Sequence, residues 1–232
     1  MLEPLTSDLW VVNRPLRFLG VSVGTRMTVA RLADGGLALH SPVEIDDDLA
    51  AALARLGPVR MLVAPNRFHH LYLAAAAARY PDAEVLGVPG LERKRPDVAF
   101  SRLLTEAGEL DAAIGHAPFT GVGALFPWGV EDFEEQLFLH APSGTLVVTD
   151  SAYCFGPDDP APTRFAMWML GAYGRLGPSR LEAWGSRRAE VEAALEPILA
   201  WDFDRVIPAH GRVVETGGKA AFRAGYEWLL GR

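Results

Sequence analysis

The order of short apolar segments along the chain is the feature that most limits its fold. Four strand-like runs, separated by Pro, Gly or Asp-Gly-Gly, occupy the N-terminal part at 8–12, 16–24, 26–32 and 37–40. Further strand-like runs at 59–64 and 83–90 then follow segments with helical spacing at 45–56 and 70–80. Strands that alternate with helices of this length are typical of βαβ units. The sequence therefore predicts an α/β fold.

The second half of the chain repeats this plan. After a stretch of loops and short strands at 91–127, strand-like runs follow at 135–141 and 144–150. The remaining predicted elements are helices at 163–176, 186–201 and 216–230, the last capped by Thr216, and a short strand at 205–208. We interpret residues 1–232 as a single domain, because one domain of this length buries an ample core.

The charge balance and the cysteine count exclude several classes of protein. The formal net charge is -7, from 22 Lys+Arg and 29 Asp+Glu, whereas a nucleic-acid binder needs a basic face to displace counterions from phosphates. The single cysteine, Cys154, forms no internal disulfide and is interpreted as a buried thiol. The N-terminal residues lack the basic and apolar pattern of a secretory leader, so we expect none, and the longest apolar run, 71–78, is far too short for a bilayer span. We expect a cytoplasmic protein with no nucleic-acid partner and no membrane contact.

Residues of the kinds that bind metal ions gather where three predicted strands end. The segment 66–70 reads Asn-Arg-Phe-His-His, and the other two strand ends carry Asp150 and His210. In open α/β folds the loops at the carboxyl ends of the strands converge, so functional sites are built there. Three histidines and one aspartate from these loops would satisfy a metal ion. The sequence therefore predicts a metal centre at these strand ends.

With these motifs the chain resembles the metallo-β-lactamase-fold superfamily, and within it a divergent domain family of unknown function marked by a PNxxHH segment. PNRFHH at 65–70 stands where the superfamily has HxHxDH, a strand ends in Asp150, and another strand leads into Pro-Ala-His-Gly at 208–211. The resemblance implies a four-layer αββα sandwich in which two mixed β-sheets are flanked by helices. Members that carry the full pattern bind two metals, usually zinc, and hydrolyse esters, amides, thioesters or phosphodiesters.

The histidines that hold the first metal in HxHxDH have no counterpart in this chain. Their positions fall on Pro65 and Arg67, and neither is an ordinary ligand, because proline has no side-chain donor atom and arginine stays protonated. The third histidine of that site would lie within 127–131, which contains none. The resemblance thus implies that the first metal site is lost.

The second metal site of the superfamily is better preserved. Its ligands correspond to His69, His70, Asp150 and His210. We expect one divalent metal ion, with zinc as the first choice and iron, manganese or nickel as alternatives, because these ligand types do not select one metal. As catalytic residues we expect Asp150, which would ligate the metal and orient its bound water, and Arg67, whose guanidinium would replace the missing cation and polarise the substrate.

These expectations describe a metal-dependent hydrolase with a reduced, mononuclear site that uses metal-bound water on a small-molecule substrate. Two alternatives stay open. One is a non-catalytic binding or scaffold member of the fold that has lost its metal site. The other is a non-haem iron redox protein, since this ligand set also holds iron. A serine hydrolase is disfavoured, because Ser41 and Ser151 lack an activating elbow.

Other chemically active side chains are interpreted as structural. His40 and His140 follow apolar strands and are expected in the core or as supporting residues, and His116 is expected in a surface loop. The aromatic segment 165–170, together with Tyr173, has helical spacing, which is typical of core packing. A hydrophobic substrate lid or a homodimer surface is the alternative for that segment.

Overall fold

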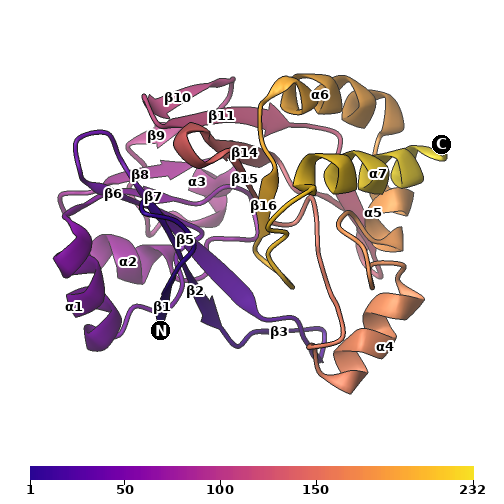
Figure 1. Cartoon of the computed structure of the whole chain (residues 1–232), viewed down its shortest axis with the longest axis horizontal. Helices are drawn as coiled ribbons and strands as arrows, with labels where there is room; N and C mark the ends of the chain where they lie inside the picture. The colour runs from indigo at the N-terminus through magenta and orange to yellow at the C-terminus, as the bar shows by residue number, and fades with distance from the viewer.

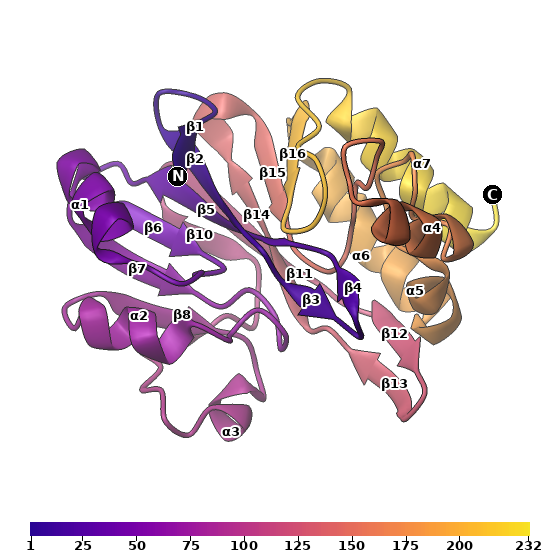
Figure 2. The same ribbon diagram turned by 90° about the horizontal axis from the view of Figure 1, so that it is seen from below.

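The computed structural model describes residues 1–232 as four layers, in which two β-sheets pack together and helices cover their outer faces (Figure 1). Helices α1 and α2 lie against the first sheet, and α6 and α7 lie against the second (Figures 1 and 2). The four-layer αββα sandwich expected from the sequence is confirmed.

The first sheet has seven strands in the order β1-β2-β5-β6-β7-β8-β9. Their bounds are β1 Leu2–Pro4, β2 Leu9–Arg14, β5 Thr25–Arg31, β6 Leu37–His40, β7 Val59–Val63, β8 Glu84–Gly87 and β9 Arg102–Leu103. The strands up to β6 pair antiparallel, and those from β6 to β9 pair parallel. The sheet is therefore mixed, and its parallel part gives the βαβ units that the sequence predicts.

The second sheet has five strands in the order β10-β11-β14-β15-β16. Their bounds are β10 Gly108–Asp111, β11 Ile114–Phe119, β14 Glu135–His140, β15 Thr145–Val148 and β16 Arg205–Pro208. Only β15 and β16 pair parallel. Two small hairpins complete the strands: β3 Arg17–Phe18 with β4 Val21–Ser22, and β12 Gly123–Phe126 with β13 Gly129–Asp132.

The helices connect the strands and cover the sheets. Their bounds are α1 Asp47–Leu56, α2 Leu73–Arg79, α3 Leu91–Lys94, α4 Ala161–Met169, α5 Arg180–Gly185, α6 Arg188–Ala200 and α7 Gly218–Leu230, with a 3-10 turn at Ala141–Ser143. Helix α1 begins within the expected Asp-rich segment, because the Asp46 side chain caps it by accepting a hydrogen bond from the Leu49 N–H at 2.8 Å. None of these helices combines the length and the apolar character that crossing a membrane requires.

Strand β2 shows why continuous apolar runs fit this architecture. Leu9 and Val11 lie in the core between the two sheets, whereas Trp10 and Val12 lie in the core between the first sheet and its helices. Successive side chains of a strand point to opposite faces. A strand with no polar face is therefore stable only between two covering layers.

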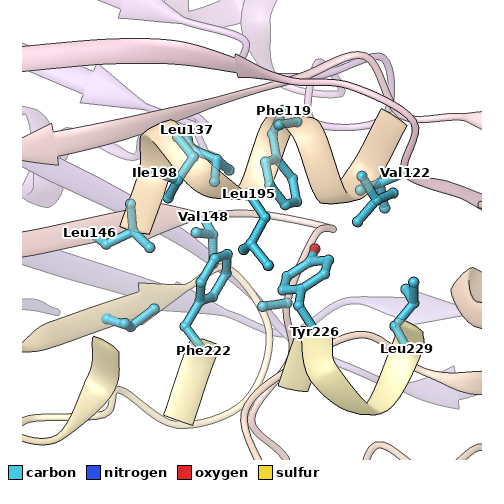
Figure 3. Close-up of a cluster of buried hydrophobic side chains, with 14 of the residues drawn as sticks. Phe119, Val122, Leu137, Leu146, Val148, Leu195, Ile198, Phe222, Tyr226 and Leu229 are labelled. Atoms are coloured by element: carbon cyan, nitrogen blue, oxygen red, sulfur yellow. The ribbon is translucent and has the colours of Figure 1, made fainter. Parts of the chain in front are cut away.

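The core between the second sheet and its helices holds the largest buried cluster of apolar side chains. Figure 3 shows its members Phe119, Val122, Leu137, Leu146, Val148, Leu195, Ile198, Phe222, Tyr226 and Leu229. Tyr226 is fully buried, and its hydroxyl donates a hydrogen bond to the Ser151 carbonyl oxygen at 2.6 Å. Helix α7 is thereby tied to the loop after β15, where one of the candidate site residues lies.

The predicted helix starts differ slightly from the observed ones, and two of the differences have a clear local cause. The helix expected at 70–80 begins at Leu73, because residues 69–72 form a turn. The histidine pair therefore precedes the helix instead of starting it. The predicted Thr216 cap is wrong, because the residue before α7 is Gly217, which has a positive φ of 70° and makes no side-chain cap.

The region after Asp150 also differs from the predicted pattern. The helix expected at 163–176 ends at Met169, and Gly171 and Gly174 follow it with positive φ angles of 69° and 76°. A glycine in this conformation commonly ends a helix. Helix α5 was not predicted, although Ser179 and Glu182 form a capping box at its start, which is a readable signal in the sequence.

A cavity-forming substitution tests the packing of the core between the second sheet and its helices. Phe222 is 0% exposed, and its ring lies 4.9 Å from that of Tyr226. Phe222→Ala should lower the free energy of unfolding by about 3–5 kcal/mol, because it removes apolar contacts and leaves a void. Urea denaturation measures the change. Arg223→Ala, at the exposed neighbouring position, is the control and should change stability by no more than about 0.5 kcal/mol. Equal losses in the two variants would contradict this packing.

Candidate metal centre

Three loops that leave the carboxyl ends of strands bring His69, Asp150 and His210 together. His69 lies in the loop after β7, Asp150 follows the end of β15, and His210 follows the end of β16. One ligand atom of each residue lies within 4.8 Å of the others. Their side chains are 7%, 13% and 8% exposed, respectively. The structure thus brings together three of the four predicted metal ligands in a nearly buried cluster.

The two imidazoles approach opposite oxygens of the same carboxylate. His69 Nε2 lies 3.3 Å from Asp150 Oδ2, and His210 Nε2 lies 3.5 Å from Asp150 Oδ1. The centroids of the two rings are 5.2 Å apart. Asp150 therefore occupies the middle of the cluster, with one histidine on each side.

The other nitrogen of each imidazole is held from outside the cluster. His210 Nδ1 donates a hydrogen bond to the Gly24 carbonyl oxygen at 2.7 Å, so Nδ1 carries a hydrogen, because a carbonyl only accepts. His69 Nδ1 lies 2.6 Å from the Ser41 hydroxyl oxygen. These contacts fix both rings with Nε2 turned toward Asp150, which is the orientation that supporting hydrogen bonds give to metal-binding histidines.

A buried glutamate shapes the loop that carries Asp150. The Glu135 carboxylate accepts hydrogen bonds from the backbone N–H groups of Thr149, Asp150 and Ser151 at 2.6, 2.9 and 2.9 Å, and from the Ser151 hydroxyl at 2.9 Å. Burial and the nearby Asp150 charge raise the pKa of Glu135, while these donors oppose that change. Glu135 was not predicted from the sequence, although a charged residue that opens an apolar strand is a visible signal.

Asn66 joins the two halves of the cluster. Its side-chain amide donates to Asp150 Oδ2 at 2.7 Å and to the Thr149 hydroxyl at 2.9 Å. Its side-chain carbonyl accepts from the backbone N–H groups of Phe68 and His69 at 2.9 and 2.8 Å. Asn66 is fully buried, so it fixes the His69 loop and the Asp150 carboxylate relative to each other. Its role was also missed from the sequence.

Mutual attraction within the cluster outweighs the cost of burial. Burial alone would raise the pKa of Asp150, but the His69 and His210 rings lower it below its usual value. Burial alone would lower the pKa of His69, but the Asp150 carboxylate raises it. Positive charge is therefore stabilised beside Asp150.

The loop that carries His210 is fixed by a buried arginine and a glycine. The Arg26 guanidinium, on β5, donates to the carbonyl oxygens of Pro208 and Gly211, the latter at 2.7 Å, and to Asn13 Oδ1 at 2.9 Å. Gly211 has φ of 84°, and a Cβ at this position would collide with the Cys154 backbone. The last residue of the Pro-Ala-His-Gly motif is therefore a glycine because the backbone of Cys154 leaves no room for a Cβ atom.

The predicted ligand His70 is not part of the cluster. Its Nδ1 lies 3.2 Å from a guanidinium nitrogen of Arg95, and Arg95 also donates to the His70 carbonyl oxygen. Burial and the charges of Lys94 and Arg95 lower the pKa of His70 to about 4. The turn at 69–72 presents only the first histidine of the pair to Asp150, so we leave His70 out of the ligand set.

The predicted catalytic residue Arg67 is also directed elsewhere. Its guanidinium donates to the Pro89 carbonyl oxygen at 3.1 Å and lies against Gly90, in the loop after β8. It is not among the residues that line the cavity at the cluster. The expectation that Arg67 takes the place of the missing cation is corrected accordingly.

The remaining histidines are buried within the sandwich. His40 and His140 are 8% and 2% exposed, in agreement with a structural interpretation, and His40 packs edge-on against Phe138. His116 was expected in a surface loop, but it lies on β11 at 6% exposure, with Nδ1 3.1 Å from Gln136 Oε1. The prediction for His116 is wrong, because β11 is an inner strand of the second sheet.

Ser41 differs from its prediction in a way that concerns the cluster. It directly follows β6, is buried, and has a positive φ of 56°. A non-glycine residue in this conformation carries backbone strain, which is common at functional sites. The positive φ of Ser41 was not predicted from the sequence, and this turn places the hydroxyl against His69.

A cavity of about 400 Å³ opens at the cluster, and its lining includes His69, Asp150 and His210. Tyr153 and Glu182 add polar groups to the lining, and the Tyr153 hydroxyl donates to Glu182 Oε1 at 3.3 Å. The volume is within the range of small-molecule sites, which is roughly 300–1,000 Å³.

The aromatic segment 165–170 lies at the edge of this cavity instead of in the core. Phe165, Trp168 and Met169 are exposed by 65%, 62% and 51%, whereas Met167 is buried and lines the cavity. The core interpretation is therefore wrong for the outward side chains. The alternatives of a hydrophobic lid or a homodimer surface agree with this exposure.

Comparison with solved structures places the chain in the metallo-β-lactamase fold class. It is similar to a metallo-β-lactamase from Pontibacter korlensis, with 10% identity and a TM-score of 0.63 over 100% of this chain and 97% of that chain. It is similar to the metallo-β-lactamase FIM-1 from Pseudomonas aeruginosa in its mono-zinc form, with 12% identity and a TM-score of 0.62 over 100% and 93% of the two chains. The Flv1 flavodiiron core from Synechocystis sp. PCC6803 is similar at 14% identity, with a TM-score of 0.65 over 100% of this chain and 60% of that chain.

The chain belongs to the family described as "Domain of unknown function (DUF4336)", which matches residues 6–167. No curated protein matches the chain. The resemblance expected from the sequence, a divergent family of unknown function within this fold, is confirmed. The fold and the His-Asp cluster together point to metal binding.

Removing the charge of Glu135 should loosen the cluster. In Glu135→Gln an amide NH₂ group would meet the backbone N–H donors at 149–151, which leaves buried donors unpaired. We expect a loss of about 1–3 kcal/mol in the free energy of unfolding, measured by denaturant titration. Glu131→Gln, at an exposed position of β13, is the matched control. If Glu135→Gln were as stable as the wild type, the central role of this carboxylate would be refuted.

The buried His40 should make the fold sensitive to mild acid. Burial, together with the neighbouring His69, lowers the pKa of His40 to about 3 from an ordinary value of 6.5. The unfolded chain therefore binds a proton that the folded chain excludes, and stability falls as the pH drops from about 6.5 toward 3. This difference amounts to about 2 kcal/mol at pH 5.

Urea denaturation of the wild type and of His40→Leu measures the contribution of His40 to the pH dependence of stability. The two pH values, about 7.5 and about 4.5, lie on either side of the ordinary histidine pKa. The variant should lose less stability than the wild type across that interval. Parallel pH profiles would show that His40 is not the group responsible.

Proposed function

We propose that the protein is a metal-dependent hydrolase that holds one divalent metal ion with His69, Asp150 and His210 and acts on a small-molecule substrate. The observation that carries this proposal is the orientation of the two imidazoles. Each has its Nδ1 in contact with a group outside the cluster and turns its Nε2 toward the Asp150 carboxylate. Zinc is the first choice of metal, and iron or manganese are alternatives.

The chemistry of the donor set fits a metal ion. Because His210 Nδ1 donates to a carbonyl, a neutral His210 presents the lone pair of Nε2 to a carboxylate oxygen, and two acceptors then face each other. A cation between them turns this repulsion into attraction, consistent with the stabilisation of positive charge beside Asp150. Catalytic zinc sites likewise have three protein ligands and leave a further coordination position open for water or substrate.

When bound, a divalent metal supplies a Lewis acid and lowers the pKa of a coordinated water molecule toward neutrality. The residues of the chain hold and orient the reacting groups. Asp150 is fixed by Asn66 and by its Glu135-bound backbone, so its carboxylate keeps one position during turnover. Burial raises the pKa of Tyr153 well above its usual value, so its hydroxyl keeps the proton that it donates to Glu182 in the cavity lining.

A non-haem iron redox protein is the second candidate. Its support is the similarity in fold to a protein described as a flavodiiron core, together with a donor set that also suits iron. A non-catalytic scaffold is supported by the absence of histidine at Pro65 and Arg67. The buried, hydrogen-bonded cluster lies beside a cavity of about 400 Å³, and this arrangement disfavours a scaffold without a binding site.

A metal-independent serine mechanism is a further candidate, favoured by one observation. The Ser41 hydroxyl, His69 and Asp150 form a continuous series with separations of 2.6 and 3.3 Å. In such a mechanism the Ser41 oxygen would bond to an acyl carbon while its proton passed to His69 Nδ1. The bond from that carbon to the leaving alcohol or thiol would then break, and His69 would return the proton to that leaving group. Water would then cleave the acyl-enzyme and restore the hydroxyl. This role and metal binding are alternatives, because they require different protonation of His69.

Metal analysis of purified protein tests the proposal. After loading with zinc and removal of the excess, the wild type should hold about one ion per chain, measured by plasma mass spectrometry. His69→Ala and His210→Ala should lower the affinity for zinc by at least about tenfold, because each removes a ligand. His70→Ala is the matched control, since it removes the neighbouring imidazole that lies outside the cluster, and it should retain the metal.

Turnover of simple esters with and without a chelator separates the candidates. The proposal expects activity that chelation abolishes and zinc restores. Activity that survives chelation but is lost in Ser41→Ala would favour the serine mechanism, and stoichiometric iron with visible absorption would favour redox chemistry. No metal above the level of the His210→Ala variant, and no turnover, would contradict the proposal and favour a scaffold.

A further inference from the structure

The cavity at the cluster is walled by apolar side chains from several separate segments. Phe18 of the β3–β4 hairpin, Phe68 beside His69 and Phe126 of β12 supply aromatic rings. The ring of Phe126 lies 5.8 Å from Phe18 and 6.4 Å from Phe68. Met167 and Leu170, at the end of α4, supply unbranched and branched aliphatic chains. The β3–β4 hairpin, the β12–β13 hairpin and α4 thus form one apolar enclosure, and all three project on the same side of the molecule (Figure 2).

Helix α4 is a cover over this enclosure. Met167 faces inward at 8% exposure, while Trp168, the next residue, is 62% exposed. The helix is attached to the β3–β4 hairpin through the Thr163 hydroxyl, which donates to the Ser22 carbonyl oxygen at 2.8 Å. The inner face of α4 therefore lines the cavity, and its outer face is exposed.

Charged groups divide the cavity lining into two parts. The buried part carries the carboxylates of Asp150 and Glu182. The lysine and arginine side chains of the lining, Arg17 and Lys94, are exposed and pair with no carboxylate. Lys94 Nζ stands 4.9 Å from the centre of the Phe68 ring. An anionic group is therefore disfavoured beside the apolar walls and the buried carboxylates, whereas a neutral apolar group fits there.

We propose that this cavity binds the apolar acyl chain of a carboxylic ester or thioester, whose carbonyl lies at the His69–Asp150–His210 cluster. This inference rests on the proposed hydrolase function and adds the substrate class to it. In the reaction, the oxygen of water bonds to the acyl carbon and the bond from that carbon to the ester oxygen or thioester sulfur breaks. One proton of the water goes to the leaving alcohol or thiol, and the products are a carboxylic acid and that alcohol or thiol.

The proposal predicts that the rate of hydrolysis depends on the length of the acyl chain. Each methylene moved from water into an apolar site gains enough transfer free energy for about a three- to fourfold change in an equilibrium or rate ratio. The zinc-loaded wild type should therefore hydrolyse p-nitrophenyl acetate, butanoate, hexanoate and octanoate with kcat/KM rising about threefold per methylene. The leaving group is the same throughout, so the slope reports the acyl site.

Two neighbouring residues of α4 provide matched variants. Met167→Ser exposes a polar group to the cavity and should flatten the dependence on chain length, whereas Trp168→Ser changes only the outer face and should keep the slope. Met167→Trp is the second cavity variant. It fills part of the space, so octanoate turnover should fall by at least about tenfold relative to acetate. Thermal unfolding of each variant confirms that it is folded.

Binding of octan-1-ol to the zinc-free protein, measured by calorimetry, separates this inference from the proposed function. Binding with a negative heat-capacity change in the wild type and its loss in Met167→Ser would support the acyl site even if no ester were hydrolysed, in which case only the hydrolase function fails. Ester hydrolysis with kcat/KM independent of chain length, or preferential turnover of acetate, would overturn the acyl site and leave the hydrolase function standing. Failure of octan-1-ol to bind would also overturn it.

Discussion

The carboxylate of Glu135 is the interaction on which the candidate centre most depends. It gathers the N–H groups of three consecutive residues, 149–151, and so bends the chain just after β15 into the shape that presents Asp150. A buried carboxylate is stable only with such a set of donors. Asn66 extends the same network to the loop of His69. The orientation of the cluster is thus fixed by hydrogen bonds beneath it, before any metal or substrate is considered.

Asn66 also gives a physical meaning to the PNxxHH segment. Where the superfamily pattern places metal-binding histidines, this chain has a proline, and an arginine that turns away toward Pro89. The asparagine between them is fully buried, and its side-chain amide and carbonyl form hydrogen bonds only with other groups of the protein. The segment therefore supplies a rigid amide support for the His69–Asp150–His210 cluster.

The fold was predictable because its signals are local. Apolar runs, an Asp-rich helix start and strand ends that carry His69, Asp150 and His210 can all be recognised within short windows. The support of the site was not predictable in the same way, because the Asn66 side-chain amide donates to Glu135 and Asp150, which lie 69 and 84 residues away. The choice between His69 and His70 depends on the turn at 69–72. The outward face of α4 was misjudged because helical spacing alone does not say which layer, if any, covers each side.

The most direct test of the account is a crystal structure of the zinc-loaded protein with anomalous diffraction measured on both sides of the zinc absorption edge. The account predicts a single zinc ion bound by Nε2 of His69, Nε2 of His210 and a carboxylate oxygen of Asp150, at the usual distances of about 2.0–2.2 Å. The Nδ1 contacts to Ser41 and Gly24 should be retained. An ion held by His70 or by surface carboxylates instead, or no anomalous peak at the cluster, would contradict it.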